Sequence, residues 1–471
     1  MTRGAVVDYT EDLDQNKLSI DAGQGLPGLP NSILSMTGSP KSLINPANLP
    51  VDPTTCQPVY PDQYIKVNTI FNVAKSAGMR TAWSDKHPAY EILNGPSGNG
   101  VDDLFTPEIN SNANGFPAGN DWTTDNKATQ QYDSCKVQAV LNEIDGYDHS
   151  RTNKVGVAAI FGMNFQTVST AEKLPTSEDA NGTVLTGGYL PGGTTPGPLL
   201  SEALDYINNE IGSMVSEIHH DGLANNTTIF VSAKHGQSPT DPAALTRVPD
   251  APIIAGLNAA WATAHPGTSP LVAYSTDDVM QLWLSDRSQA AADFAKAYLR
   301  SNSAGGNDVN GAAKTVLSSG LTTVYAGAES ANFFGVPNSD PRHPDVYGIV
   351  QHGVVYTGGQ GKIAEHGGAD PQDRSVPILV SGADVTHHQV VDSQVETTQI
   401  APTILQLLGL DPNQLQSVQI EHTAVLPGVV SGHGDQDGGQ GGKGDQGGRG
   451  GQGDQGGDQG DQGGGQGNQG Q

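Results

Sequence analysis

The sequence predicts an α/β fold in which a mostly parallel sheet is covered by helices on both faces. The prediction rests on three places where an amphipathic helical run is followed or preceded by a short apolar run. It also rests on the connections, which are dense in glycine and proline, as in the segment 190–198. Long connections of this kind lie above the carboxyl ends of parallel strands, where α/β sheets place their functional sites.

The first helix and strand fall within residues 66–84. Apolar residues recur at helical spacing, Gly78 is placed to end the helix, and the segment 80–84 follows as a strand. The helical positions are Ile70, Phe71, Ala74 and Ala77.

The second pair is clearer, because one apolar helical face runs from Leu199 to Ile218 and stops before Gly222. Residues 228–232, Thr-Ile-Phe-Val-Ser, then predict a buried strand. The third pair is a strand at 376–380 and a later helix with apolar positions at Ile400, Ile404, Leu405 and Leu408, closed by Gly409.

Two further apolar runs, 155–161 and 279–284, are bounded by polar loops. The second is followed by an alanine-rich helix that runs through Leu299. Residues 431–471 are almost entirely Gly, Gln and Asp, so they have almost no apolar side chains to bury and are predicted to be a disordered tail. Residues 1–430 are therefore predicted to form the folded domain.

The formal net charge of the chain is -27, and no run of Lys and Arg offsets it locally. A surface this acidic repels phosphate backbones, so we expect no nucleic-acid polymer as a partner. No apolar run approaches the roughly 20 residues that span a bilayer, and residues 1–20 lack the apolar core of a signal peptide.

The two cysteines, Cys56 and Cys135, lie far apart without the spacing of a zinc site, and they either pair or stay free. Asn181, Asn225 and Asn226 match the acceptor pattern for N-glycosylation, a pattern short enough to be a polar turn instead.

The most suggestive junction is 229–237, Ile-Phe-Val-Ser-Ala-Lys-His-Gly-Gln, where a strand ends in two ionisable residues and a glycine. A second is Glu365-His-Gly-Gly, which lies ahead of the strand at 376–380. Both resemble the type I phosphodiesterase and nucleotide pyrophosphatase family of the alkaline phosphatase superfamily. In that family the histidines at the positions of His235 and His366 bind two divalent metal ions. The resemblance implies an alkaline-phosphatase-like fold.

The sequence departs from that family at other ligand positions. Lys234 stands where the family has an aspartate, and Asn164 stands where a second carboxylate would lie. Lys234 is either a solvated loop lysine or an ammonium group that replaces a metal ion as counter-charge. The first strand and the hydroxyl nucleophile of the family would precede residue 1, so the resemblance implies an N-terminally incomplete domain with no catalytic residue of its own.

The resemblance implies a metal-dependent hydrolase of small phosphate esters, nucleotides among them, with a divalent metal, zinc in particular, as cofactor. Relatives of this kind are often secreted, which makes an extracellular location an expectation. The alternative is a catalytically inactive protein that binds anions on the same scaffold, and a third possibility is a chain that does not fold stably alone.

The segment 83–98 supplies further candidate residues. Asp85, Lys86 and His87 follow a strand and could bind an anion together with Lys234 and Asn164; the competing interpretation is a rigid turn held by proline and glycine. Asp145 and His149 have the spacing of a metal pair, but the helical run before them favours a helix-end turn. The chain has no Walker loop, no GxGxxG after a strand and no GxSxG motif.

Overall fold

The computed structural model describes residues 33–52, 54–109, 122–276, 279–383, 385 and 389–429. The chain divides into two units, Met1–Ser431 and Gly432–Gln471, and all described residues belong to the first. The predicted tail lies outside the described residues, as does the segment 1–32.

The first part of the fold holds four short strands, which pair as two two-stranded sheets. They are β1 (Ala82–Ser84), β2 (Asp103–Phe105), β5 (Thr228–Ser232) and β14 (Ile378–Gly382). β1 and β2 pair in parallel, whereas β5 and β14 pair antiparallel. Parallel bridges from Thr81 to Ile160 and from Ser84 to Met163 add one more segment beside β1.

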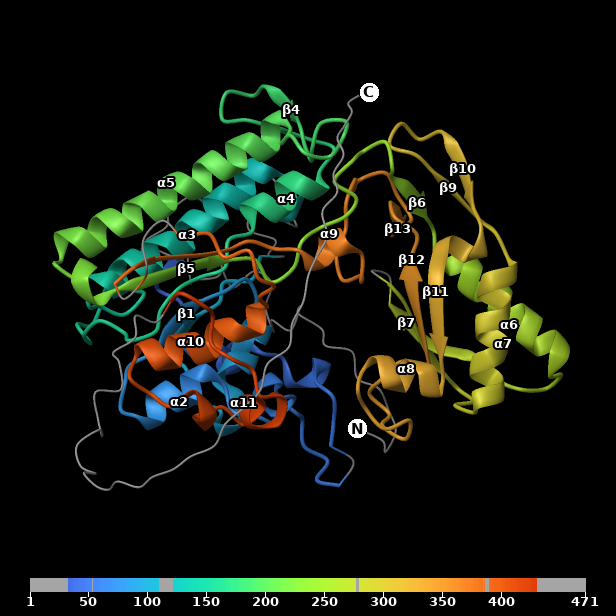
Figure 1. The fold of residues 1–471 in the computed structure, drawn as a ribbon, viewed down its shortest axis with the longest axis horizontal. Coiled ribbons are helices and arrows are strands. Elements are labelled where there is room, and N and C mark those ends of the chain that lie inside the picture. Colours follow the sequence, from blue (N-terminus) through green and yellow to red (C-terminus); the bar gives the residue numbers. More distant parts are fainter. Residues whose placement is uncertain are drawn as a thin grey trace, which may run out of the picture. The chain divides into compact units, whose positions relative to one another are not determined.

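Helices cover both faces of these strands (Figure 1). One face carries α3 (Asn126–Ile144), α4 (Thr167–Lys173) and α5 (Pro198–His220), and the other carries α2 (Ile70–Ser76), α10 (Ile400–Leu407) and α11 (Gln416–Glu421). Ile144 and Ile218 pack with Ile229 of β5 in one apolar cluster. Phe71 and Ile404 pack with Leu104 of β2 in another, so each helical layer has its own core against the sheet.

The predicted helix ends are confirmed by backbone geometry. Gly78, Gly222 and Gly409 each follow a helix and have φ angles of 79°, 71° and 73°. Glycine adopts this left-handed conformation at no steric cost, and so it ends helices well. At the other end of α2, the side chains of Thr69 and Asn72 each accept a hydrogen bond from the other's backbone N–H.

Residues 246–356 form a second part built on two four-stranded sheets. One has the order β10 (Ala313–Val316), β9 (Ala304–Asn307), β6 (Thr246–Val248) and β13 (Val354–Tyr356). The other has the order β11 (Leu321–Ala326), β12 (Val346–Val350), β8 (Met280–Leu284) and β7 (Val272–Thr276). Helices α6 (Ala251–Ala264), α7 (Gln289–Ser301) and α8 (Ala328–Phe333) accompany them.

The remaining elements are short. A hairpin joins β3 (Thr176–Glu178) to β4 (Val184–Thr186), and α9 (Pro371–Arg374) precedes β14. Short 3₁₀ helices lie at Pro40–Leu43, Pro46–Asn48, Pro61–Gln63, Pro88–Ser97, Trp122–Thr124, Ala224–Asn226, Ser318–Gly320, Thr397–Gln399 and Pro412–Gln414.

The predicted α/β class with helices on both faces is confirmed, and the sheets are mixed. The parallel pairings are β1 with β2 and β13 with β6, while the other strand pairs of the described residues run antiparallel. The strand at 228–232 was expected to be buried, but its residues are half-buried and Ser232 is exposed. Among the described residues β5 pairs on one edge, with β14, which accounts for its exposure.

Within the apolar run 155–161, Ile160 forms one parallel bridge, to Thr81 just before β1, and Val155 and Val157 are exposed. The run at 279–284 is confirmed as β8, and α7 follows it as expected. Cys56 is exposed, Cys135 is buried, and both are free thiols. Within the described part of the chain, none of the helices combines the length and the apolar character needed to cross a membrane.

Candidate active site

Two histidines from distant parts of the chain lie against each other. The ring centroids of His235 and His366 are 3.9 Å apart, with an angle of 32° between the ring planes. His235 follows the carboxyl end of β5, and His366 lies in the loop before α9. Both rings are half-buried, which fits a site at the edge of the sheet.

Backbone hydrogen bonds join the two segments that carry these histidines. The N–H of Ser238 donates to the carbonyl of Glu365 at 2.8 Å, and the N–H of Glu365 donates back to Ser238 at 2.9 Å. The N–H of Gly236 donates to the carbonyl of Asp373 at 2.7 Å. The spacing of the histidines is therefore fixed by main-chain contacts on both sides.

Lysine side chains surround the histidine pair. Lys234 Nζ donates to the hydroxyl of Tyr90 at 3.0 Å, and Lys173 Nζ lies 3.0 Å from Glu365 Oε2. Lys362 pairs with the other oxygen of the same carboxylate. Lys86 lies within electrostatic range of His235, as do Lys173 and Lys234.

These surroundings favour the neutral form of both imidazoles. Burial lowers the pKa of His235, and the positive charges of Lys234, Lys173 and Lys86 lower it further. Burial lowers the pKa of His366 to about 3, with added repulsion from Lys173. Burial alone would raise the pKa of Glu365, but the ammonium groups of Lys173 and Lys362 hold it below its ordinary value. The site therefore combines neutral rings with an ionised, lysine-bound carboxylate.

Of the predicted residues on the loop after β1, Asp85 and His87 are buried in the interior, and Lys86 is half-buried near the site. His87 is buried, its Nδ1 lies 2.6 Å from Glu108 Oε1, and its ring stacks on Tyr90 at 6.4 Å. Asp85 is buried as well, and accepts hydrogen bonds from Trp83 Nε1 at 3.0 Å and from the N–H of Lys86 at 2.9 Å.

Burial raises the pKa of Asp85. His87 and Asp85 therefore hold this loop as a rigid turn. Lys86, between them, is half-buried, and its charge acts on His235.

Asn164 does not touch the histidine pair through any described contact. Its side-chain oxygen accepts a hydrogen bond from Gln166 Nε2 at 2.7 Å, and its carbonyl accepts one from Lys136 Nζ. Lys136 in turn pairs with Asp133. Asn164 therefore belongs to the hydrogen-bonded group of Lys136, Asp133 and Gln166 that precedes α4.

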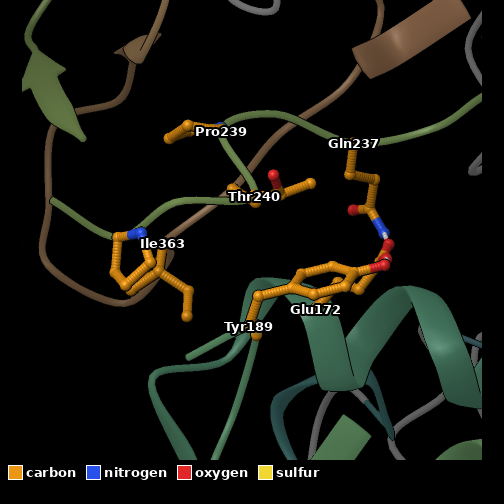
Figure 2. A pocket seen from close by; sticks show the side chains of 9 residues that line it. Glu172, Tyr189, Gln237, Pro239, Thr240 and Ile363 are labelled. Atoms are coloured by element: carbon orange, nitrogen blue, oxygen red, sulfur yellow. Dashed lines mark hydrogen bonds between the residues drawn. The ribbon is translucent and has the colours of Figure 1, made fainter. Parts of the chain in front are cut away.

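A small pocket lies beside the site (Figure 2). Residues that follow His235 and residues that precede His366 line part of it. Glu172, Tyr189 and Gln237 meet there, with Gln237 Nε2 donating to Glu172 at 2.5 Å and Tyr189 donating to Glu172 at 3.3 Å. Pro239, Thr240 and Ile363 complete the labelled wall. The pocket therefore places an apolar surface next to the charged groups of Lys173, Lys362 and Glu365.

The donors around His235 and His366 do not fit a zinc ion of ordinary coordination, which takes four ligands. The carboxylate next to His366 is held by two lysines. Within the described ranges, one group of three metal-ligating side chains lies within ligand range of one another, Glu217, His220 and Asp221 at the solvated end of α5. Neither His235 nor His366 belongs to it.

Sequence reasoning missed Lys173, Glu365 and Tyr90. Glu365 could have been found beside His366, but the approach of Lys173 from the end of α4 exists only in three dimensions. The roles of the predicted residues in binding and catalysis stay predictions.

Comparison with known proteins finds one family model and several solved structures that this chain resembles. The sulfatase family model matches residues 35–410. Among solved structures, the phosphonoacetate hydrolase of Sinorhizobium meliloti 1021 is 14% identical, with 86% of this chain and 85% of that chain covered and a TM-score of 0.41. Murine ectonucleotide pyrophosphatase/phosphodiesterase 5 is 11% identical, with 80% and 81% covered and a TM-score of 0.47.

Wild-type alkaline phosphatase PafA is 14% identical, with 61% of this chain covered and a TM-score of 0.41, and this chain spans 51% of its length. No curated protein matches the sequence. The narrower resemblance to the type I phosphodiesterase and nucleotide pyrophosphatase family stays a prediction. Because the matched family model covers most of the residues, the chain belongs to the sulfatase family, within the alkaline phosphatase superfamily.

Proposed function

We propose that this protein hydrolyses small phosphate esters, nucleotides among them, at the site formed by His235 and His366. Membership of the sulfatase family supports hydrolysis of a phosphate or sulfate ester. The observation that carries the proposal is the contact of the His235 and His366 rings, whose centroids are 3.9 Å apart, with the contacts of Lys234 and Lys173 nearby.

The residues at the site have complementary chemistry. A neutral imidazole offers one donor and one acceptor nitrogen, so His235 and His366 can each orient an ester oxygen or a water molecule. The ammonium groups of Lys234 and Lys173 stabilise negative charge on the non-bridging oxygens as the ester is cleaved.

Members of the superfamily use divalent metal ions, which polarise the ester oxygens when bound. The described donors at His235 and His366 do not complete such a site. We derive no step through a metal ion and assign no nucleophile among the described residues.

A second candidate is the catalytically inactive anion-binding protein. Lys234 favours it, because an ammonium group at this position binds an anion without activating a nucleophile. In that case folded protein binds phosphate and does not turn over its esters.

The test is turnover of p-nitrophenyl phosphate, bis(p-nitrophenyl) phosphate, p-nitrophenyl thymidine 5′-monophosphate and p-nitrophenyl sulfate by the full chain, with and without added zinc. We expect release of p-nitrophenol from a phosphate ester, and a loss of about 100-fold or more in His366→Gln. The matched control is His219→Gln on the exposed side of α5, which should leave the rate unchanged. Folded protein without turnover of any of these esters would favour the inactive protein.

A further inference from the structure

We propose that Asp62 and Glu91 share one proton in the interior, and that loss of this proton loosens the segment that carries Tyr90. With Lys41 the two carboxyl groups form a pH-sensitive latch, which does not depend on the proposed function. The latch lies where three short 3₁₀ helices pack together. These are η1 (Pro40–Leu43), η3 (Pro61–Gln63) and η4 (Pro88–Ser97).

Two buried carboxyl groups depend on one ammonium group in this latch. The side chain of Asp62 is 5% exposed and that of Glu91 is 0% exposed, whereas that of Lys41 is 43% exposed. Lys41 Nζ lies 3.0 Å from Asp62 Oδ2 but 3.8 Å from Glu91 Oε1, beyond hydrogen-bond distance. If both carboxyl groups were ionised, one negative charge would remain in the interior without a counter-charge, which is strongly unfavourable. One bound proton removes that charge.

The hydrogen bonds of the pair leave a place for this proton. The backbone N–H of Asp62 donates to Glu91 Oε2 at 2.8 Å. Asp62 Oδ1 and Glu91 Oε1 are buried, and neither has a hydrogen-bond partner in the described part of the chain. A protonated carboxyl group is a hydrogen-bond donor, and the two carboxyl groups lie within reach of such a bond. The proton therefore serves both of them.

The charged and titratable groups around Glu91 place its titration near neutral pH. Burial raises the pKa of Glu91 to about 7; the charge of Asp62 acts in the same direction and that of Lys41 acts against it. Burial and the charge of Glu91 raise the pKa of Tyr64 to about 12, so the Tyr64 hydroxyl stays neutral. The ring of Tyr60 lies beneath the Lys41 ammonium group, 4.7 Å from it to the ring centroid.

The far half of η4 is held by uncharged groups from the start of α2. The Thr69 hydroxyl donates to the carbonyl of Leu93 at 3.1 Å, and Asn72 Nδ2 donates to the carbonyl of Asn94 at 2.8 Å. These groups do not titrate. The pH-sensitive contact is therefore confined to the first turns of η4, around Glu91.

Tyr90 connects the latch to the candidate active site. It precedes Glu91, its ring stacks on His87 with centroids 6.4 Å apart, and its hydroxyl accepts a hydrogen bond from Lys234 Nζ at 3.0 Å. Ionisation of both carboxyl groups favours hydration of the pair and separation of η3 from η4, which loosens the backbone at Tyr90.

The direction of the pH dependence follows from the raised pKa of Glu91. The folded state binds this proton more tightly than the unfolded state, in which the pKa has its ordinary value of 4.5. The stability that the latch contributes is therefore fully present below about pH 4.5 and is lost as the pH rises through about 7.

The experiment is hydrogen–deuterium exchange of the full chain between about pH 5.5 and about pH 8.5, corrected for the intrinsic exchange rate at each pH. We expect the protection of residues 88–93 to fall at least about 10-fold as the pH rises through about 7. Glu91→Gln resembles the protonated acid and should keep its protection across this range. Glu421→Gln removes an exposed carboxylate from the end of α11 and should behave like the unchanged protein.

Asp62→Asn tests the other member of the pair, and thermal unfolding checks that each variant folds. With one carboxylate left for Lys41, protection should persist at about pH 8.5 in this variant as well. Protection that does not change with pH in the unchanged protein, or that falls equally in Glu91→Gln, overturns the proposal. An equal fall in α5 would also overturn it, because the loss of protection would then be global.

Discussion

Lys136 Nζ lies 3.1 Å from Asp133 Oδ1, and neither side chain is exposed to solvent. The pair supports the start of α4. Asp133 Oδ2 accepts hydrogen bonds from the N–H groups of Gln166 and Thr167, each at 2.8 Å, and from the Thr167 hydroxyl at 2.6 Å. Because α4 is only seven residues long and ends at Lys173, this buried ion pair fixes the helix that carries a lysine to the site.

Removing one member of this pair should destabilise the fold strongly. Lys136→Met leaves the Asp133 carboxylate buried without its counter-charge, and we expect the free energy of unfolding to fall by about 3–5 kcal/mol. Chemical denaturation of the purified variant measures this loss. The control is Lys296→Met, whose partner Glu329 is about half exposed, with 55% of its side chain accessible, so the loss should stay below about 1 kcal/mol. Equal losses in the two variants would contradict the supporting role of the buried pair.

The position of His235 should depend on the glycine that follows it. A Cβ atom at Gly236 would lie 2.0 Å from the carbonyl oxygen of Gln372, so Gly236→Ala must push two backbone segments apart. We expect a loss of about 1–3 kcal/mol in the free energy of unfolding, and weaker phosphate binding, because the same backbone holds His235 beside His366. Gly358→Ala is the control, since a Cβ there meets nothing within 4 Å. Unchanged stability in Gly236→Ala would show that the two segments are not tightly joined.

The helices of the α/β part could be predicted from the sequence because their apolar positions repeat at the helical period. The helix expected from Leu199 to Ile218 is α5, Pro198–His220, and the strand expected at 228–232 is β5. The direction of strand pairing could not be predicted, because strands of three to six residues show the same apolar pattern in parallel and antiparallel sheets.

The site could be predicted in part. His235 and His366 were identified from motifs at strand ends, and the structure brings their rings together. The contact between Lys173 and Glu365 could not be predicted, because it joins residues 192 positions apart through tertiary packing alone. Asp85 was a candidate for anion binding, but the structure buries it under Trp83, since the short strand before it ends inside the core.

Asp373 gives the protein a pH dependence that can be measured. Burial raises its pKa from 3.8 to about 6, with repulsion from Asp370 and Glu365 in the same direction. The folded state therefore binds this proton more tightly than the unfolded state, and stability is lost as the pH rises through about 6.

We expect Asp373→Asn to stabilise the protein at pH 8, by on the order of 1–3 kcal/mol, and to have little effect below pH 4. Thermal unfolding at both pH values measures the difference, and Asp205→Asn on the exposed side of α5 controls for loss of a charge. A stabilisation that is the same at both pH values would contradict the assignment to Asp373.

Lys234 should decide between anion binding and metal binding at this site. Lys234→Asp removes an ammonium group next to His235 and supplies a carboxylate ligand in its place, as the family resemblance implies for metal-binding relatives. We expect zinc affinity to rise at least about 10-fold, or about 1.4 kcal/mol, and phosphate affinity in metal-free protein to fall. Competition with a chromophoric chelator measures the zinc affinity. Lys234→Asn separates the two causes, because it removes the ammonium group without adding a charge. If the Asn variant gains as much zinc affinity as the Asp variant, repulsion by Lys234 alone keeps zinc away, whereas no gain in either variant would show that His235 and His366 cannot act together as ligands.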